Sequence, residues 1–157
     1  MSTLPQKIAR EKICKLEKYM CSLPQVEITL KHYFIKGLYA REMIVPKDVL
    51  MSGLEHRTKT IGIMSKGEMI VWNEDGTRPH IKAPFTHIGE PGTKRIGYAV
   101  EEVIWTTFHV TELTDLYEIE KEQFVITDEV PRMFDFATGV IRNKELQTSK
   151  EEPKCLE

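Results

Sequence analysis

The chain has 157 residues, of which 41% are hydrophobic and 29% are charged, and its formal net charge is −2. This length is typical of one domain and is sufficient for a buried core. The near-neutral balance of charge gives no global electrostatic basis for binding DNA or an anionic membrane. We therefore expect neither partner, and we expect any anion site to be a local group of basic side chains.

Localisation signals are absent from the pattern of apolar residues. No apolar run approaches the roughly 20 residues of a membrane-spanning helix, and the first residues lack the apolar core of a signal peptide. Three cysteines, Cys14, Cys21 and Cys155, form no Cys-x-x-Cys pair. This usage is typical of reduced, non-catalytic thiols in a cytosolic protein.

Residues 1–25 predict an N-terminal helical segment. Ser2 and Thr3 are good helix caps, and Pro5 is well placed in a first turn. Apolar residues then recur at helical spacing: Ala9, Ile13, Leu16 and Met20. We predict a helix over about 5–20 that packs either on its own domain or on another subunit.

Residues 26–110 predict a β-barrel or sandwich. Roughly nine short strands with alternating or β-branched patterns are separated by turn signals such as Asp75-Gly76. The expected strands are 26–34, 38–45, 49–54, 61–64, 68–73, 78–83, 85–88, 96–100 and 103–110. Many short strands at close spacing favour an antiparallel architecture over βαβ units. The fold class is therefore mainly β.

Residues 111–146 predict a C-terminal extension that packs on the barrel or on a neighbour. An acidic helix is expected over 114–124, followed by a short strand at 124–126 and an apolar segment at 133–141. Residues 147–157 are charged, and we expect them to be disordered.

The stretch 37–109 resembles the cupins, which are small β-barrels with two conserved motifs. Counting the first motif back from Gly67 places residues at the leading glycine and the three ligand positions: Asp48, Leu54, His56 and Thr60. Counting the second motif from Gly92 places Arg95 at its histidine, with Pro84, Glu90 and Ala99 at its first glycine, proline and asparagine. The similarity lies in spacing and implies a cupin-like barrel.

The residues at the ligand positions do not favour a metal. A cupin metal site combines imidazoles and a carboxylate, whereas here only His56 offers an imidazole and Arg95 places a cation at the fourth position. A guanidinium repels a divalent cation, so we expect neither a metal nor another cofactor. The substitution favours an anion instead.

Six blocks are similar to a family of small cupin-like proteins encoded by tailed bacteriophages. They are Gly37–Glu42, Ser65–Glu68, Glu74–Gly76, Ala83-Pro84, Pro91–Ala99 and Trp105–His109. This resemblance implies a non-catalytic phage protein in the cytoplasm of an infected bacterium. It also implies a homo-oligomeric sponge that sequesters the cyclic oligonucleotides of anti-phage immune signalling.

The candidate ligand-binding residues combine basic, hydroxyl and aromatic side chains. They are Arg41, His56, Arg57, Thr60, Lys94, Arg95, Tyr98, Trp105, Thr107 and His109. Arginine forks bind phosphate, and aromatic rings stack on bases. Alternatives remain for several: Trp105 in the core, His56 as a structural histidine, and Arg57 with Lys59 as a solvated turn. Strand alternation predicts that Trp105, Thr107 and His109 share one face.

Two other functions are compatible with the pattern. One is a metal-independent cupin enzyme of the epimerase or lyase type, in which His56 or His109 is the general base. The other is a structural or accessory virion protein. The chain shows no phosphate-binding loop, no dinucleotide fingerprint and no recognisable nucleophile triad, so we expect a binding protein and not an enzyme.

Overall fold

The structure, a computed structural model, describes residues 3–125, apart from the side chains of Ile8 and Cys21. Two helices and nine strands follow one another in this part of the chain. They are α1 (Leu4–Cys21), β1 (Thr29–Ile35), β2 (Leu38–Val45), β3 (Leu50–Ser52), β4 (Thr60–Lys66), β5 (Glu68–Asn73), β6 (His80–Lys82), β7 (Phe85–Gly89), β8 (Arg95–Ala99), β9 (Val103–Val110) and α2 (Leu116–Gln123). Within residues 3–125, no helix is long and apolar enough to cross a bilayer.

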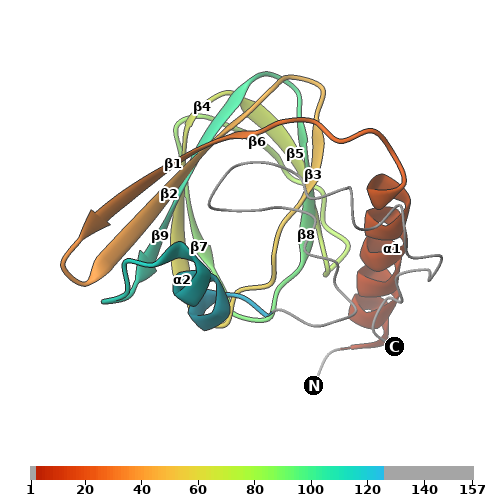
Figure 1. Cartoon of the computed structure of the whole chain (residues 1–157). Coiled ribbons are helices and arrows are strands. Elements are labelled where there is room, and N and C mark those ends of the chain that lie inside the picture. The colour runs from red at the N-terminus through yellow and green to blue at the C-terminus, as the bar shows by residue number, and fades with distance from the viewer. Residues whose placement is uncertain (1–2, 126–157) are drawn as a thin grey trace.

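The strands form two antiparallel sheets that face each other (Figure 1). The five-stranded sheet has the order β1-β2-β9-β4-β7, and the four-stranded sheet has the order β3-β8-β5-β6. The chain passes from one sheet to the other at Gly67, whose φ of +94° is readily available only to glycine. The mainly β, antiparallel fold class predicted from the sequence is confirmed, as is the N-terminal helix.

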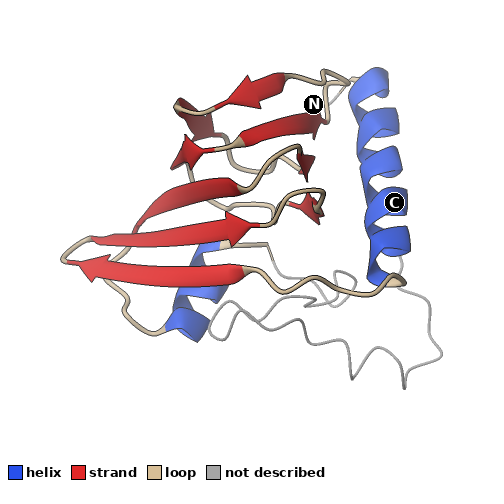
Figure 2. Ribbon diagram, turned by 90° about the horizontal axis from the view of Figure 1, so that it is seen from above, coloured by secondary structure: helices blue, strands red, loops and turns tan. Residues whose placement is uncertain are grey.

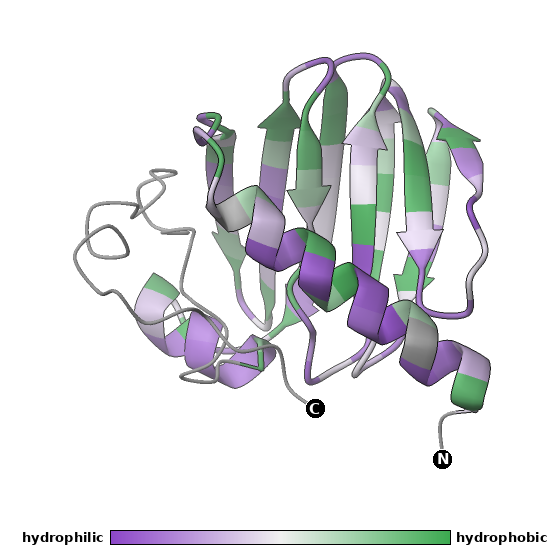
Figure 3. Ribbon diagram, turned by 90° about the vertical axis from the view of Figure 1, so that its right-hand side faces the viewer, coloured by the Kyte–Doolittle hydropathy of each residue, from purple (hydrophilic) through white to green (hydrophobic). Residues whose placement is uncertain are grey.

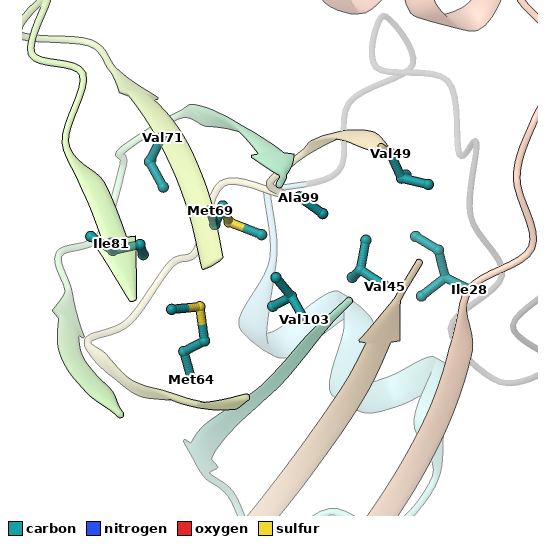
Figure 4. Packing of buried hydrophobic residues seen from close by; sticks show 9 residues of the cluster. All are labelled: Ile28, Val45, Val49, Met64, Met69, Val71, Ile81, Ala99 and Val103. Carbon is teal, nitrogen blue, oxygen red and sulfur yellow. The ribbon is translucent and has the colours of Figure 1, made fainter. Parts of the chain in front are cut away.

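The apolar core fills one half of the space between the sheets. It comprises Ile28, Val45, Val49, Met64, Met69, Val71, Ile81, Ala99 and Val103, which both sheets contribute (Figure 4). Because side chains alternate along a strand, these residues also identify which positions of each strand point inward. In β2 and β9 these are the odd-numbered residues, since Val45 pairs with Val103.

Helix α1 lies across the outer face of the four-stranded sheet (Figure 3). Its capping box, formed by Thr3 and Gln6, satisfies backbone groups at its start. Ile13 of the helix and the outward-facing Ile96 of β8 are both buried, at 5% and 0% exposure. Glu17 accepts hydrogen bonds from Ser52 and Lys94, which fixes the helix to the edge of the sheet. The sequence left open whether this helix packs on its own domain or on another subunit, and in the structure it packs on its own domain.

Helix α2 lies at one end of the barrel, near the β1–β2 hairpin (Figure 2). Asp115 caps its first turn through the backbone N–H of Glu118, at 3.0 Å. The buried residues of this helix are Ile119 and Gln123. Phe124 follows the helix and forms an isolated antiparallel bridge with His56.

Most predicted strands lie where the sequence placed them, and β2, β5 and β9 have the predicted bounds. The first strand differs because it begins at Thr29 and not at Val26. Its partner β2 ends at Val45, where Pro46 follows, so pairing between the two strands stops near Thr29. The strand expected at 124–126 is reduced to the bridge at Phe124, and the segments 133–141 and 147–157 lie outside the described residues.

Gly62 of β4 allows the indole of Trp105 to lie against the strand. A Cβ atom at position 62 would lie 2.6 Å from Cζ2 of that ring. We therefore expect Gly62→Ala to lower the free energy of unfolding by about 1–3 kcal/mol, the usual cost of overpacking. Chemical denaturation measures this, with the exposed Ser65→Ala of the same strand as control. Equal stability of the two variants would contradict the packing described.

Candidate functional site at the polar end of the barrel

The inward-facing side chains change from apolar to polar along the barrel. In β2 the inward positions run from Val45 to Arg41, and in β9 they run from Val103 to His109. The same change occurs in the strands opposite. We call the resulting group the polar end: Arg41, His56, Thr60, His87, Arg95, Thr107 and His109. Seven such side chains inside a small barrel are the strongest sign of a functional site in this molecule.

Arg41 is buried, with 4% of its surface exposed. Its guanidinium carbon lies 5.0 Å from the ring centroid of Phe124, a cation–π contact. Burial lowers the pKa of Arg41 to about 10, while Tyr39 and Glu120 oppose that change. At neutral pH the barrel therefore contains a permanent cation.

His56 and His109 lie together beside this cation, with their ring centroids 5.4 Å apart. Burial, together with the charges of Arg41 and Arg95, lowers the pKa of His56 to about 4. The pKa of His109 falls to about 3 through burial, Arg41 and His56, against a smaller raising effect of Gln123. Both imidazoles are therefore neutral at neutral pH.

The two rings differ in their hydrogen bonds. Nδ1 of His56 lies 3.2 Å from the hydroxyl of Thr60. His109 is fully buried, and within residues 3–125 neither of its ring nitrogens meets a hydrogen-bond partner. A buried polar group without a partner is costly and is often retained for function.

Arg95 enters the polar end from β8. Its Nη1 donates to Nε2 of His87 at 2.6 Å, and its Nη2 donates to the hydroxyl of Thr93 at 3.3 Å. Burial and the Arg95 charge both lower the pKa of His87. Sequence reasoning missed His87, although the alternation of Phe85, His87 and Gly89 in β7 would have placed it inside.

Trp105 separates the polar end from the apolar core. The indole Nε1–H donates to the hydroxyl of Thr107 at 3.1 Å, two residues further along β9. The register of β9 confirms that Trp105, Thr107 and His109 share one face, and that this face is the inner one. Trp105 also packs against the core, which is one of its two predicted roles, while its role in ligand binding stays a prediction.

The residues after α2 cover the polar end. Phe124 is 1% exposed and makes edge contacts with His56 and His109, at centroid distances of 4.9 and 5.6 Å. Arg57 donates its Nε–H to the carbonyl of Phe124 at 2.8 Å, and Thr58 donates to Gln123 at 2.8 Å. No local pattern predicts this cover, because Phe124 lies 68 residues beyond His56.

Three of the predicted site residues do not belong to the polar end. Lys94 is buried toward α1, in an ion pair with Glu17. Tyr98 points outward and donates to Asp48, because it lies an odd number of residues from Arg95 in the same strand. Arg57 is at the rim, where it holds Phe124. The others lie together: Arg41, His56, Thr60, Arg95, Trp105, Thr107 and His109.

Helix α1 supports the loop that carries His56. Arg10 donates to Glu55, the neighbour of His56, and also to Glu74 at 2.9 Å and to the carbonyl of Gly92 at 3.0 Å. The backbone N–H of Lys94 donates to the same Glu74. One arginine thus joins the helix to the loops that precede β8 and β4, which positions Arg95 and His56.

No family model matches the chain, and no curated protein matches it. Solved structures do match. Ectoine synthase from P. lautus has 11% identity and a TM-score of 0.53, covering 68% of this chain and 83% of that chain. KdgF from Halomonas sp. has 15% identity and a TM-score of 0.47, covering 57% of this chain and 86% of that chain. An RmlC-like cupin from Shewanella frigidimarina has 14% identity and a TM-score of 0.47, covering 58% of this chain and 81% of that chain. At these identities the likeness shows the fold alone, which is the cupin fold.

The cupin register counted from the sequence agrees with the backbone. Asp48, at the position of the leading glycine, has a φ of 63°, a conformation that glycine adopts most easily. The ligand positions do not fit a divalent metal, however. Leu54 and Thr60 are poor ligands, and two guanidiniums lower the pKa of His56. Within residues 3–125, no three His, Cys, Asp or Glu side chains are grouped to hold a metal ion.

The buried neutral imidazoles predict sensitivity to acid. In the unfolded chain these histidines bind protons below a pH of about 6.5. In the folded chain His56 binds a proton only near pH 4 and His109 only near pH 3. We therefore expect the free energy of unfolding to fall as the pH drops from about 6.5 toward 4, by a few kcal/mol in total. Denaturation midpoints at several pH values measure this.

His56→Gln removes one of the two groups and is expected to flatten the profile. The exposed Ser65→Ala, which removes no titratable group, is the control and is expected to give the profile of the wild type. Parallel profiles for wild type and His56→Gln would contradict the lowered pKa of His56.

Proposed function

We propose that this chain is a binding protein for an anionic small molecule and that the ligand occupies the polar end of the barrel. One observation carries the proposal: Arg95 enters a buried group of neutral side chains, and its hydrogen-bond partners His87 and Thr93 are neutral as well. Arg41 adds a second, buried guanidinium at the same end. An anion would neutralise the Arg95 charge, whereas a cation would be repelled.

Arg95 supplies the more accessible of the two charges. It is only partly buried, and its hydrogen-bond partners, His87 and Thr93, are neutral. Glu74 acts on the Arg95 charge, but its carboxylate accepts hydrogen bonds from Arg10 and from the backbone N–H of Lys94. An arginine with neutral partners retains capacity for the two-pronged hydrogen bonds that it forms with phosphate.

The side chains around the two arginines suit a ligand that carries a ring as well as a charge. His56, His109 and Phe124 form a cluster of edge and tilted ring contacts, and Trp105 lies below Thr107. Stacking of a base on such rings contributes about 1–3 kcal/mol. The chemistry that fits is a phosphorylated, base-bearing molecule, bound after Phe124 moves aside.

The resemblance to phage-encoded proteins suggests one member of this class, the cyclic oligonucleotides of bacterial immune signalling. Our proposal extends to that ligand and to its sequestration in the cytoplasm of an infected host. Binding without turnover also agrees with the histidines. A pKa of about 4 or 3 makes His56 and His109 weak general bases at neutral pH, which disfavours the epimerase or lyase alternative.

Isothermal titration with 3′,3′-linked cyclic dinucleotides tests the proposal. We expect binding to weaken about 10- to 100-fold in Arg95→Gln, because a hydrogen bond to a charged group contributes about 1.5–3 kcal/mol. The exposed Arg78→Gln removes the same charge elsewhere and is expected to bind like the wild type. Ligand released by heat should be chemically intact.

Three results would overturn parts of this proposal. Absence of binding to cyclic dinucleotides, mononucleotides and inorganic phosphate would overturn the anion site. Binding of phosphate or mononucleotides alone would overturn the cyclic ligand. Conversion of the nucleotide, abolished in His109→Gln, would assign an enzyme instead.

A further inference from the structure

The outer face of the five-stranded sheet carries a continuous apolar row. Strand register places one residue from each strand side by side, in the order Tyr33, Ala40, Phe108, Ile61 and Ile88. These residues alternate with the inward-facing ones, so all five point away from the core. The row crosses the sheet from one edge strand to the other without a charged side chain.

Three of the five side chains are open to solvent in the described part of the chain. Ile88 is 60% exposed, Tyr33 is 50% exposed and Ile61 is 48% exposed, whereas the small Ala40 between Tyr33 and Phe108 is 7% exposed. A second apolar row lies beside it at the hairpin, formed by Ile35, Leu38 and Val110. Single exposed apolar residues are ordinary, but a contiguous apolar patch of this extent marks an interaction surface.

The outer face of the four-stranded sheet, in contrast, is covered by a helix. There α1 covers the sheet, and Ile96 beneath it is 0% exposed. In Figure 2, α1 lies beside the four-stranded sheet and α2 lies at the end of the barrel near the hairpin. Within residues 3–125 neither helix therefore covers the apolar row, and the five-stranded sheet lacks the layer that its partner has.

We infer that a second copy of this chain covers this face, in a two-fold symmetric dimer with sheet packed on sheet. The area of this face supports a second copy of the chain as its occupant. Five strands at a spacing of about 4.8 Å, each about seven residues long, give a face on the order of 500 Å² in plan. With the neighbouring hairpin row, this approaches the roughly 800 Å² of accessible surface that each partner buries in a stable dimer.

The charge pattern also suits an identical partner. The row beside the apolar one contains Lys31 and Glu42, which form an ion pair at 3.0 Å on the same face. The face therefore has no net charge of either sign, and two copies meet without repulsion. An anionic membrane or a strongly charged partner would find no complementary surface here.

Sedimentation equilibrium of the full chain, over about 1–100 μM, tests the inference. We expect a dimer in the wild type, and a dissociation constant at least tenfold higher in Ile88→Lys and in Ile61→Lys. Leu4→Lys is the matched control, because Leu4 is a 71% exposed apolar residue on α1. Its dissociation constant is expected to equal that of the wild type, and thermal melting confirms that each variant folds.

A wild type that stays monomeric at 100 μM would overturn the inference. This would also be the outcome if residues 126–157 occupied the face in place of a second copy. A dimer that Ile61→Lys and Ile88→Lys leave intact would overturn it as well, because the interface would then lie elsewhere. Neither result depends on whether the polar end binds a ligand.

Discussion

The buried guanidinium of Arg41 is the constraint on which the polar end depends. It lies inside a β-barrel, 4% exposed, where a charge is expensive unless its surroundings compensate it. Phe124 stacks against it, and Tyr39 and Glu120 favour its charged form. Burial, reinforced by the charge of Arg41, keeps the nearby His56 and His109 neutral far below the pH at which a free imidazole takes up a proton.

The rest of the molecule holds this arrangement in place from two sides. On one side, α1 reaches the loop of His56 through Arg10 and Glu55, and it reaches the start of β8 through Glu17 and Lys94. On the other side, the residues after α2 close the barrel with Phe124. At the positions where the cupin motifs place imidazoles and a carboxylate, this chain has Leu54, His56, Thr60 and Arg95.

Much of the fold could be predicted because it depends on local pattern. Alternation and turn residues place β2, β5 and β9 correctly, and Asp48 takes the left-handed backbone that motif counting assigns to a glycine. The inward face of β9 follows from alternation alone. Tyr98 could have been excluded from the site by the same rule, since it and Arg95 must point to opposite sides of β8.

Other parts of the site depend on contacts between distant segments, which no local pattern reveals. His87 meets Arg95 only because β7 and β8 lie in facing sheets. Phe124 meets His56 only because the chain returns to the barrel after α2. Lys94, which looks available for an anion in the sequence, is neutralised by Glu17 from a helix 77 residues earlier.

Nuclear magnetic resonance of the histidine rings is a direct test of whether burial beside the Arg41 cation keeps two imidazoles neutral. Chemical shifts of the ring carbons and nitrogens, followed from pH 8 downward, report the protonation of each imidazole. We expect His56 and His109 to remain neutral at pH 5.5. Titration of His56 and His109 near pH 6.5 would contradict this expectation, because the polar end would then lack the buried charge that defines it.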